Sequence, residues 1–233
     1  MLLLIDSRDR TDLTNSTSNF TIQLPNTLVN VTSCKLKQVG MNHKIYNISF
    51  EYSNNVFKYT ELSDDYSLTI PDGFYSPQQL ASVLKALLCY NSPNQWTYDV
   101  SYSQTSFRFS ISCTSLFSLP MSSLGRYMGF VSDNIEGNEL IAEALSKIDD
   151  PNYLFLDISF LPQNLMASNT IRTSFILSND VFATEYSGLC NQCVSFSSQQ
   201  QIKLFTVYLK NRDGTEAQLY GTDFYIILEI NQV

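Results

Sequence analysis

Residues 67–88 have the sequence SLTIPDGFYSPQQLASVLKALL, which predicts a strand, a tight turn and a helix in immediate succession. Leu68 and Ile70 alternate with polar residues, as they do in a half-buried strand. Pro71-Asp72-Gly73 is expected to end that strand, because proline fixes φ at the start of a turn and glycine supplies positive φ at its end.

The helix that follows carries its own start signal. Ser76 is expected at the N-cap, with Pro77 at the first helical position and Gln79 at the third, which is the arrangement of a capping box. Apolar side chains then recur at helical spacing and form one face: Leu80, Val83, Leu84, Leu87 and Leu88. The sequence therefore predicts a helix over about residues 76–89.

Most of the remaining chain alternates apolar and polar residues, which is typical of strands. The clearest hairpin joins residues 96–102 to residues 107–111, whose apolar positions share one face. Residues 202–210 are apolar on both faces, so this strand is expected at the centre of a sheet. Further strands are expected at residues 1–5, 20–24 (ended by Pro25-Asn26), 31–39, 46–52, 56–60, 154–160, 172–177 and 224–230.

Two short helical insertions are also predicted, at residues 121–130, closed by Gly129, and at residues 139–148. So few helices among so many strands do not make βαβ units. The chain shows no fixed-period repeat, low-complexity linker or break in composition. The predicted fold class is therefore all-β: a single jelly-roll antiparallel β-sandwich forming one domain over residues 1–233.

Residues 6–19 are predicted to form a mobile N-terminal arm. The segment holds one apolar residue, Leu13, among Ser, Thr, Asn, Asp and Arg, so it can bury little surface to offset the entropy of ordering. Its expected role is contact with other subunits or with other proteins. Deleting residues 1–18 is accordingly expected to leave the sandwich folded.

Charge and targeting patterns exclude several classes of protein. The net charge is −8 and the basic residues are scattered, so direct binding of nucleic acid is not expected. Met1–Ile5 is too short for the apolar core of a signal peptide, and no segment approaches the about 18 apolar residues of a membrane span. Five cysteines without a secretion signal are expected to be reduced thiols.

Candidate chemical groups are few. His43 is the only histidine, and its neighbours carry no nucleophile signature, so a structural role is favoured over catalysis. Cys190-Asn-Gln-Cys193 is a C-x-x-C motif without a second such motif or a thioredoxin-like context. Asp149-Asp150 before Pro151 is typical of a turn. No catalytic or cofactor-binding residue is assigned, and the chain is not expected to be an enzyme.

The acidic segment 133–139 gathers Asp133, Glu136 and Glu139 within a short loop. The spacing lacks the pattern of an EF-hand. Calcium binding and a polar loop leading into a helix both fit this segment. No metal ligand is therefore assigned here.

Several short stretches, taken in their order along the chain, carry a resemblance. They are IDSRDR at 5–10, NFTIQLP at 19–25, KIYNI at 44–48, LTIPDGFYS at 68–76, the aromatic hairpin at 96–112, LGRYMGF at 124–130, the NRDG turn at 211–214 and the strand at 224–230. This set resembles the penton-type minor capsid proteins of virophages, Polinton-like viruses and related double-stranded DNA viruses, including their "Y-N-I", "I-P-x-G-x-Y-S" and "L-G-F" segments.

The resemblance implies a single jelly roll that assembles as a homopentamer at the fivefold vertices of an icosahedral virion. The implied partners are further copies of the chain and a double-jelly-roll major capsid protein. The implied location is the virion. The family carries no catalytic residues, so none is transferred to this sequence.

Two other functions remain open from the sequence. The surplus of Tyr, together with Trp96 and neutral polar residues, suits a glycan- or receptor-binding module, such as a head or fibre domain. A polysaccharide hydrolase requires paired carboxylates that converge in a cleft. Binding to glycans would support the first alternative, and hydrolysis lost on a single Asp or Glu substitution would support the second.

Overall fold

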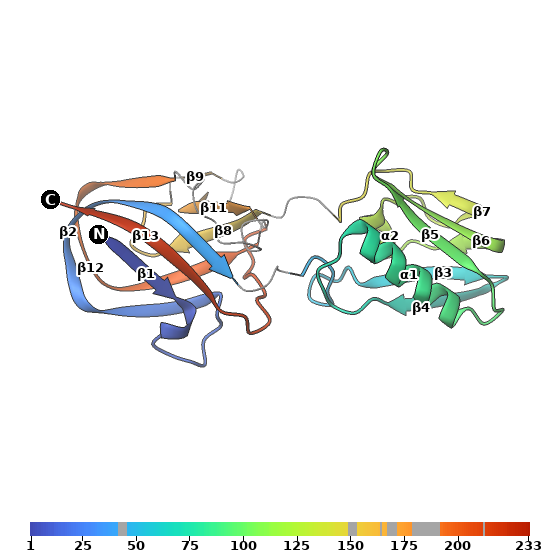
Figure 1. Ribbon diagram of the computed structural model, residues 1–233, viewed down its shortest axis with the longest axis horizontal. Helices are drawn as coiled ribbons and strands as arrows, with labels where there is room; N and C mark the ends of the chain where they lie inside the picture. Colours follow the sequence, from blue (N-terminus) through green and yellow to red (C-terminus); the bar gives the residue numbers. More distant parts are fainter. Residues whose placement is uncertain (42–45, 149–152, 164, 167–171, 179–191, 212) are drawn as a thin grey trace. The chain divides into compact units, whose positions relative to one another are not determined.

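The chain forms two compact units, which are described separately. A computed structural model describes residues 1–41, 46–148, 153–163, 165–166, 172–178, 192–211 and 213–233 (Figure 1). Unit 1 comprises residues 1–45 and 151–233, and unit 2 comprises residues 46–150. The sequence predicted one domain over residues 1–233, and within that stretch the structure distinguishes two compact units. The physical reason is that the buried apolar side chains form two separate cores, one within each unit.

Unit 1 is built on a six-stranded antiparallel sheet. Its strands, in spatial order, are β1 (Leu2–Asp6), β13 (Phe224–Gln232), β2 (Asn19–Met41), β12 (Cys193–Lys210), β8 (Tyr153–Ile158) and β11 (Phe175–Ser178). A short 3-10 helix, η1 (Ser7–Asp9), follows β1, and β9 (Leu165–Met166) pairs with β10 (Arg172–Thr173). The predicted central position of residues 202–210 is confirmed, because β12 lies between β2 and β8.

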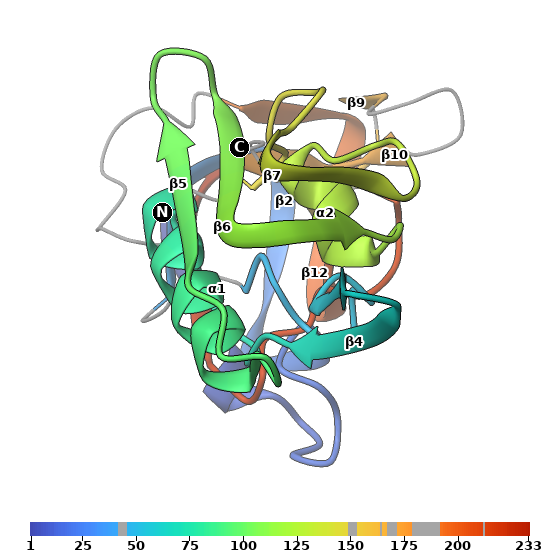
Figure 2. The ribbon, with the colours of Figure 1, turned by 90° about the vertical axis from the view of Figure 1, so that its right-hand side faces the viewer.

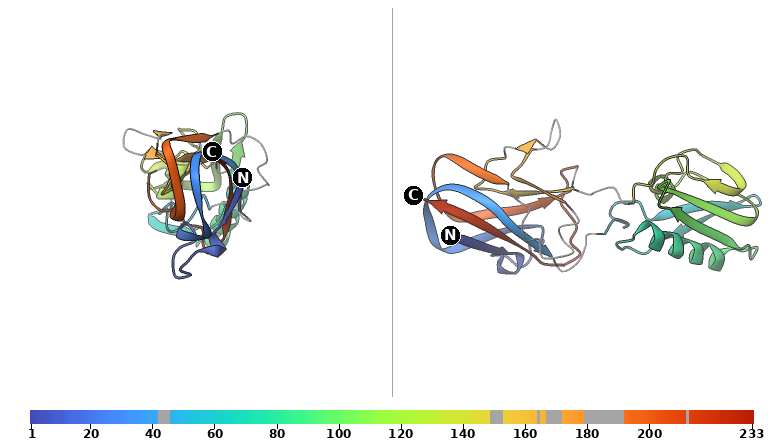
Figure 3. Two further views of the ribbon diagram at one scale, coloured as in Figure 1. Left: turned by 90° about the vertical axis from the view of Figure 1, so that its left-hand side faces the viewer. Right: turned by 45° about the horizontal axis from the view of Figure 1, so that its top comes forward.

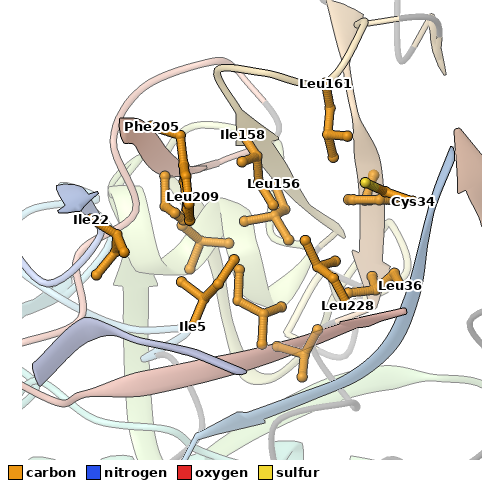
Figure 4. Close-up of a cluster of buried hydrophobic side chains, with 14 of the residues drawn as sticks. Ile5, Ile22, Cys34, Leu36, Leu156, Ile158, Leu161, Phe205, Leu209 and Leu228 are labelled. Atoms are coloured by element: carbon orange, nitrogen blue, oxygen red, sulfur yellow. The ribbon is translucent and has the colours of Figure 1, made fainter. Parts of the chain in front are cut away.

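The core of unit 1 is formed by buried side chains that this sheet contributes. Side chains from its strands and from the turn after β8 converge there, and ten of them are labelled in Figure 4: Ile5, Ile22, Cys34, Leu36, Leu156, Ile158, Leu161, Phe205, Leu209 and Leu228. The two ends of the chain are adjacent (Figure 3), since the amino group of Met1 donates a 2.7 Å hydrogen bond to the carbonyl of Ile230. β1 thus contributes both a strand and a core residue, Ile5, to unit 1.

β2 runs through Pro25, where the sequence predicted a strand end. Its pairing with β12 shifts register between Gln23 and Leu28, so the missing N–H of Pro25 interrupts no ladder bond. Asn30 takes a positive φ of 55° a few residues later. The two strands predicted at 20–24 and 31–39 are therefore one strand that bends at an irregularity.

Segment 6–19 differs from the predicted arm, because both of its ends are fastened to unit 1. Ser7 is fully buried: its Oγ donates to Asp223 (2.8 Å) and accepts from the N–H of Phe224 (3.1 Å). Ser18 is also buried and donates to Glu216 (2.7 Å). Only the middle is exposed, as at Leu13. Deleting residues 1–18 would remove β1. We therefore no longer expect the sandwich to stay folded after that deletion.

Unit 2 packs two helices against an antiparallel sheet. The sheet has the order β4 (Asp64–Thr69), β3 (Val56–Glu61), β6 (Arg108–Leu119), β5 (Tyr98–Ser103), and β7 (Ile135–Ile141) also pairs with β6. The helices are α1 (Pro77–Asn91), which runs beside β5 in Figure 2, and α2 (Ser123–Met128). Leu80, Leu84 and Leu88 of α1 are completely buried in the core of this unit.

The sequence predictions for α1 and for the aromatic hairpin are confirmed. The Ser76 hydroxyl accepts the N–H of Gln79 (3.2 Å), and the Gln79 side chain accepts the N–H of Ser76 (2.9 Å). In the hairpin, Val100 pairs with Ile111 and Tyr102 with Phe109. α2 ends at Gly129, as predicted, with a φ of 101°; a Cβ there would lie 2.3 Å from the carbonyl oxygen of Ala144.

The helix predicted at 139–148 is wrong. Residues 139–141 belong to β7, and the backbone N–H groups that follow donate to carbonyls distant in sequence. Ala142 donates to Phe109 (2.9 Å) and Ser146 to Phe107 (3.0 Å). These long-range hydrogen bonds override the local helix propensity of residues 142–147, as tertiary contacts often do.

The strand predicted at 46–52 is also wrong. Only Ile48 forms a bridge, to Gly73, and the chain then turns. Side chains compete for its backbone: the Asn54 amide accepts the N–H of Ser49 (2.9 Å) and donates to the carbonyl of Asn47 (2.8 Å). Asn and Ser side chains commonly replace a ladder with such local bonds.

The buried side chain of Asn47 fastens the two ends of unit 2 to each other. Its Nδ2 donates to the carbonyls of Tyr75 (2.8 Å) and Ile148 (3.2 Å), and its Oδ1 accepts the N–H of Tyr75 (2.9 Å). Since its first and last residues meet, unit 2 can be inserted between β2 and β8 without interrupting the sheet of unit 1. The predicted all-β class with antiparallel sheets of jelly-roll type is confirmed.

Candidate functional site

Several residues singled out from the sequence lie outside the described part of the chain. They are His43, Asp149, Asp150 and Cys190. Cys193 is exposed at the start of β12, opposite Lys35 of β2. Cys34 is completely buried, and this burial raises the pKa of its thiol to about 12, so it does not ionise at neutral pH.

The acidic segment 133–139 does not converge on one point. Asp133 accepts the N–H of Met121 (2.8 Å), whereas Glu136 and Glu139 lie along β7 opposite Ser118 and Ser112. Across the described ranges, no three His, Cys, Asp or Glu side chains are placed to hold a metal ion. No helix within those ranges is long and apolar enough to cross a membrane.

A buried carboxylate lies in the core of unit 2. Glu61 is completely buried, and its two oxygens accept from the Tyr98 hydroxyl (3.1 Å) and the Asn94 amide (2.9 Å). Burial, with a smaller contribution from the nearby Glu61 carboxylate, raises the pKa of both Tyr98 and Tyr59, that of Tyr59 to about 12. This cluster has structural hydrogen bonds on every oxygen of Glu61, so it is a stabilising network rather than a reactive site.

Unit 2 is therefore expected to lose stability at alkaline pH. The pKa of Tyr59 in the folded protein lies above its unfolded value near 10. The contribution of Tyr59 to the free energy of unfolding is therefore complete below pH 10 and is lost as pH rises toward 12. For Tyr59 alone the loss between pH 9 and 11 is about 1 kcal/mol. Urea unfolding followed by Trp96 fluorescence measures it, because this single tryptophan packs on the core of unit 2. Tyr59→Phe is expected to flatten the pH slope; an unchanged slope would contradict the assignment.

The outer edge of β1 carries an apolar patch. Leu2 and Leu4 are 65% and 59% exposed, and Leu4 lies directly opposite Ile227 of β13, on the same face. We call Leu2, Leu4 and Ile227 the β1 patch. In the part of the chain that the structure describes, β1 pairs only with β13, so the other edge of its backbone is open (Figure 1). An open apolar edge strand is a template for pairing with another chain.

The opposite edge of the same sheet is blocked. The Gln192 side chain accepts the N–H of Ile176 (2.9 Å) and donates to its carbonyl (2.7 Å). This amide occupies the position of a neighbouring strand along β11. The molecule thus protects one edge of the sheet against pairing and leaves the apolar one available.

A polar pocket of about 430 Å³ lies in unit 1 between three segments: residues 6–8, 40–41 and 220–225. Asp6 and Arg8 form a two-pronged ion pair, with Nε–Oδ1 2.9 Å and Nη2–Oδ2 2.5 Å. The hydrogen bond from the Arg8 side chain is the main cause that lowers the pKa of Asp6. Asp223, on the far segment, accepts from Ser7 (2.8 Å) and lies 3.5 Å from the Arg10 guanidinium.

Two tyrosines line this pocket. The Tyr225 ring lies over Gly40, where a Cβ would come within 2.3 Å of the ring, and its hydroxyl accepts from Gln38 (2.8 Å). Tyr220 is 43% exposed and has a φ of 50°. It lies in a tight turn closed by a hydrogen bond from the Thr222 N–H to the Leu219 carbonyl (2.8 Å). This left-handed conformation costs a non-glycine residue about 1–2 kcal/mol. The described residues of unit 2 that share it are Ser53, Leu62, Gln95, Phe107 and Asn134.

Comparison with known proteins gives a likeness in structure but none in sequence. No protein-family model matches the chain, and no curated protein matches its sequence. Among solved structures, the chain is similar to the crystal structure of SeMet-labeled mavirus penton protein, with a TM-score of 0.41 and 12% sequence identity over 100% of this chain and 99% of that one. At this TM-score and identity, no residue role is carried from that protein to this chain.

Sequence analysis missed both the pocket and the open edge. The pocket brings together segments from near the two ends of the sequence, and none of these segments contains a ligand-binding motif. One local signal was present: Tyr220-Gly221 followed by Thr222 and Asp223 has the composition of a tight turn. The β1 patch was visible only as an apolar run at residues 1–5, which did not reveal which side would be exposed.

Proposed function

We propose that this chain is a structural capsid protein, a penton that assembles as a homopentamer at the fivefold vertices of an icosahedral virion. Its further partner would be a double-jelly-roll major capsid protein. The ordered stretches of the sequence support this proposal, because they occupy both units. Residues 19–25 begin β2, residues 68–76 lead into α1, and residues 124–130 form α2 with its glycine cap.

The observation that carries the proposal is the open edge of β1. A closed ring needs a surface on each copy that the next copy covers. The β1 patch supplies an apolar surface beside unpaired backbone groups, and the Lys37–Glu229 ion pair (3.2 Å) lies next to it. A second copy of this chain is the occupant we assign, since the Gln192 amide leaves β1 as the available edge of this sheet among the described strands.

Leu4→Lys tests this assignment. A charged side chain on an edge strand opposes pairing with another strand. The substitution is therefore expected to lower the association constant of the pentamer at least tenfold, so that more of the purified protein is monomeric. Light scattering over a dilution series measures the change. Leu145→Lys is the matched control, because Leu145 is 58% exposed and belongs to unit 2, whereas the β1 patch belongs to unit 1.

Two results would contradict the proposal. One is an equal loss of assembly in the Leu145→Lys control and in Leu4→Lys. The other is an image of the virus particle in which the fivefold vertices carry no density for this chain.

A further inference from the structure

We infer that the pocket between residues 6–8, 40–41 and 220–225 binds a neutral pyranose sugar. This goes beyond the proposed capsid function and does not depend on it. The pocket has a volume of about 430 Å³, which lies within the roughly 300–1,000 Å³ of small-molecule sites.

The charges of the pocket favour a neutral, hydroxyl-rich ligand. Asp6 is matched by Arg8, and Asp223 is approached by Arg10, so no net positive field is left to hold a phosphate or carboxylate. The same pairing fixes hydrogen-bond acceptors and donors side by side. Adjacent hydroxyl groups of a sugar both donate and accept, and such paired groups match them.

The aromatic residues favour a ring-shaped ligand with an apolar face. A pyranose presents a face of C–H groups, which packs on the electron-rich face of an aromatic ring. Tyr225 is pre-positioned for this, because Gly40 provides the room beneath its ring and Gln38 holds its hydroxyl. A ring fixed before binding loses little entropy when the ligand arrives.

Tyr220 supplies the second observation. A tight turn with positive φ favours Gly, Asn or Asp, yet this one holds a partly exposed tyrosine at the pocket. Backbone strain of this kind gathers at ligand sites. The turn therefore presents an aromatic side chain at a backbone conformation that favours Gly, Asn or Asp.

Sugar binding by the full chain tests the inference. The probes are glucose, galactose, mannose and N-acetylglucosamine, with N-acetylneuraminic acid as the charged comparison. Saturation-transfer NMR detects contact, and calorimetry gives the dissociation constant. We expect at least one neutral sugar to bind, and to bind at least tenfold more tightly than the acidic sugar.

Tyr220→Asn separates binding from folding. Asparagine tolerates positive φ, so the variant is expected to stay folded, as its melting curve checks, while affinity for the sugar falls at least tenfold. Tyr90→Ala is the control, because Tyr90 is 87% exposed on α1 of unit 2 and its loss should leave binding unchanged.

Three outcomes would overturn the inference: no saturation transfer to any neutral sugar, an unchanged sugar affinity in Tyr220→Asn, or tighter binding of the acidic sugar than of the neutral ones. Failure here leaves the capsid proposal standing, since Leu4→Lys tests a different surface. Conversely, Leu4→Lys protein that no longer assembles is still expected to bind the sugar.

Discussion

Replacing Lys210 with Met is expected to lower the free energy of unfolding of unit 1 by about 3–5 kcal/mol. Lys210 forms an ion pair with Asp157, and both side chains are largely buried, at 16% and 7% exposure. Without the ammonium group, the Asp157 carboxylate stays buried, and its partners among the described residues are the Ser174 N–H (3.0 Å) and the Gln163 amide (3.3 Å). An uncompensated buried charge is among the most costly changes in a protein core.

Chemical unfolding followed by far-ultraviolet circular dichroism measures this loss, with Trp96 fluorescence reporting unit 2 as an internal reference. Lys37→Met is the matched control. The Lys37–Glu229 pair is also a cross-strand ion pair of unit 1, but its side chains are 43% and 40% exposed, so its loss is expected to cost no more than about 1 kcal/mol. Equal effects of the two substitutions would show that burial does not set the cost.

A double substitution, Lys210→Met with Asp157→Asn, separates the pair from its burial. Removing both charges is expected to recover most of the stability lost in Lys210→Met, because no buried charge remains. If the double variant is less stable than Lys210→Met, the carboxylate is held mainly by its other partners. The ion pair would then contribute little.

Local features of this fold could be predicted from the sequence because they depend on neighbouring residues. The capping box at Ser76 and the apolar face of α1 are written within one segment, and both are confirmed. The hairpin of β5 and β6 is likewise specified by alternation across a short turn. The glycine cap of α2 follows from Gly129 being able to adopt positive φ.

Features that depend on distant partners could not be predicted. Residues 142–147 have the composition of a helix, but their N–H groups donate to Phe107, Phe109 and other distant carbonyls. The division into two units leaves no trace in composition, because both cores draw on the same alternating pattern. A boundary at residue 46 becomes visible only when Asn47 is seen to hold Ile148.

The candidate surfaces follow the same rule. Whether β1 is open depends on Gln192 lying beside Ile176 at the other edge of the sheet, more than 150 residues along the chain. The pocket needs Asp6 and Tyr225 to be neighbours across β1 and β13. Neither arrangement follows from spacing in the sequence, since each is set by strand order.

Replacing Asn47 with Asp is expected to lower the stability of unit 2 by about 3 kcal/mol or more. The change keeps the size of the side chain and the acceptor for the N–H of Tyr75. It removes the NH₂ group that donates to the carbonyls of Tyr75 and Ile148, and it places a buried carboxylate oxygen against them. Two carbonyls lose their partner, and the new charge is repelled by both of them.

Urea unfolding of unit 2, followed by Trp96 fluorescence, measures this effect. The loss is expected to shrink as pH falls, because a protonated carboxyl group can donate to one of the two carbonyls. Asn138→Asp, at an exposed position of β7, is the control and should change stability by no more than about 0.5 kcal/mol. A loss at Asn47 as small as that control would mean that the ends of unit 2 are held together by other contacts, and Asn47 would not explain how an inserted unit closes on itself.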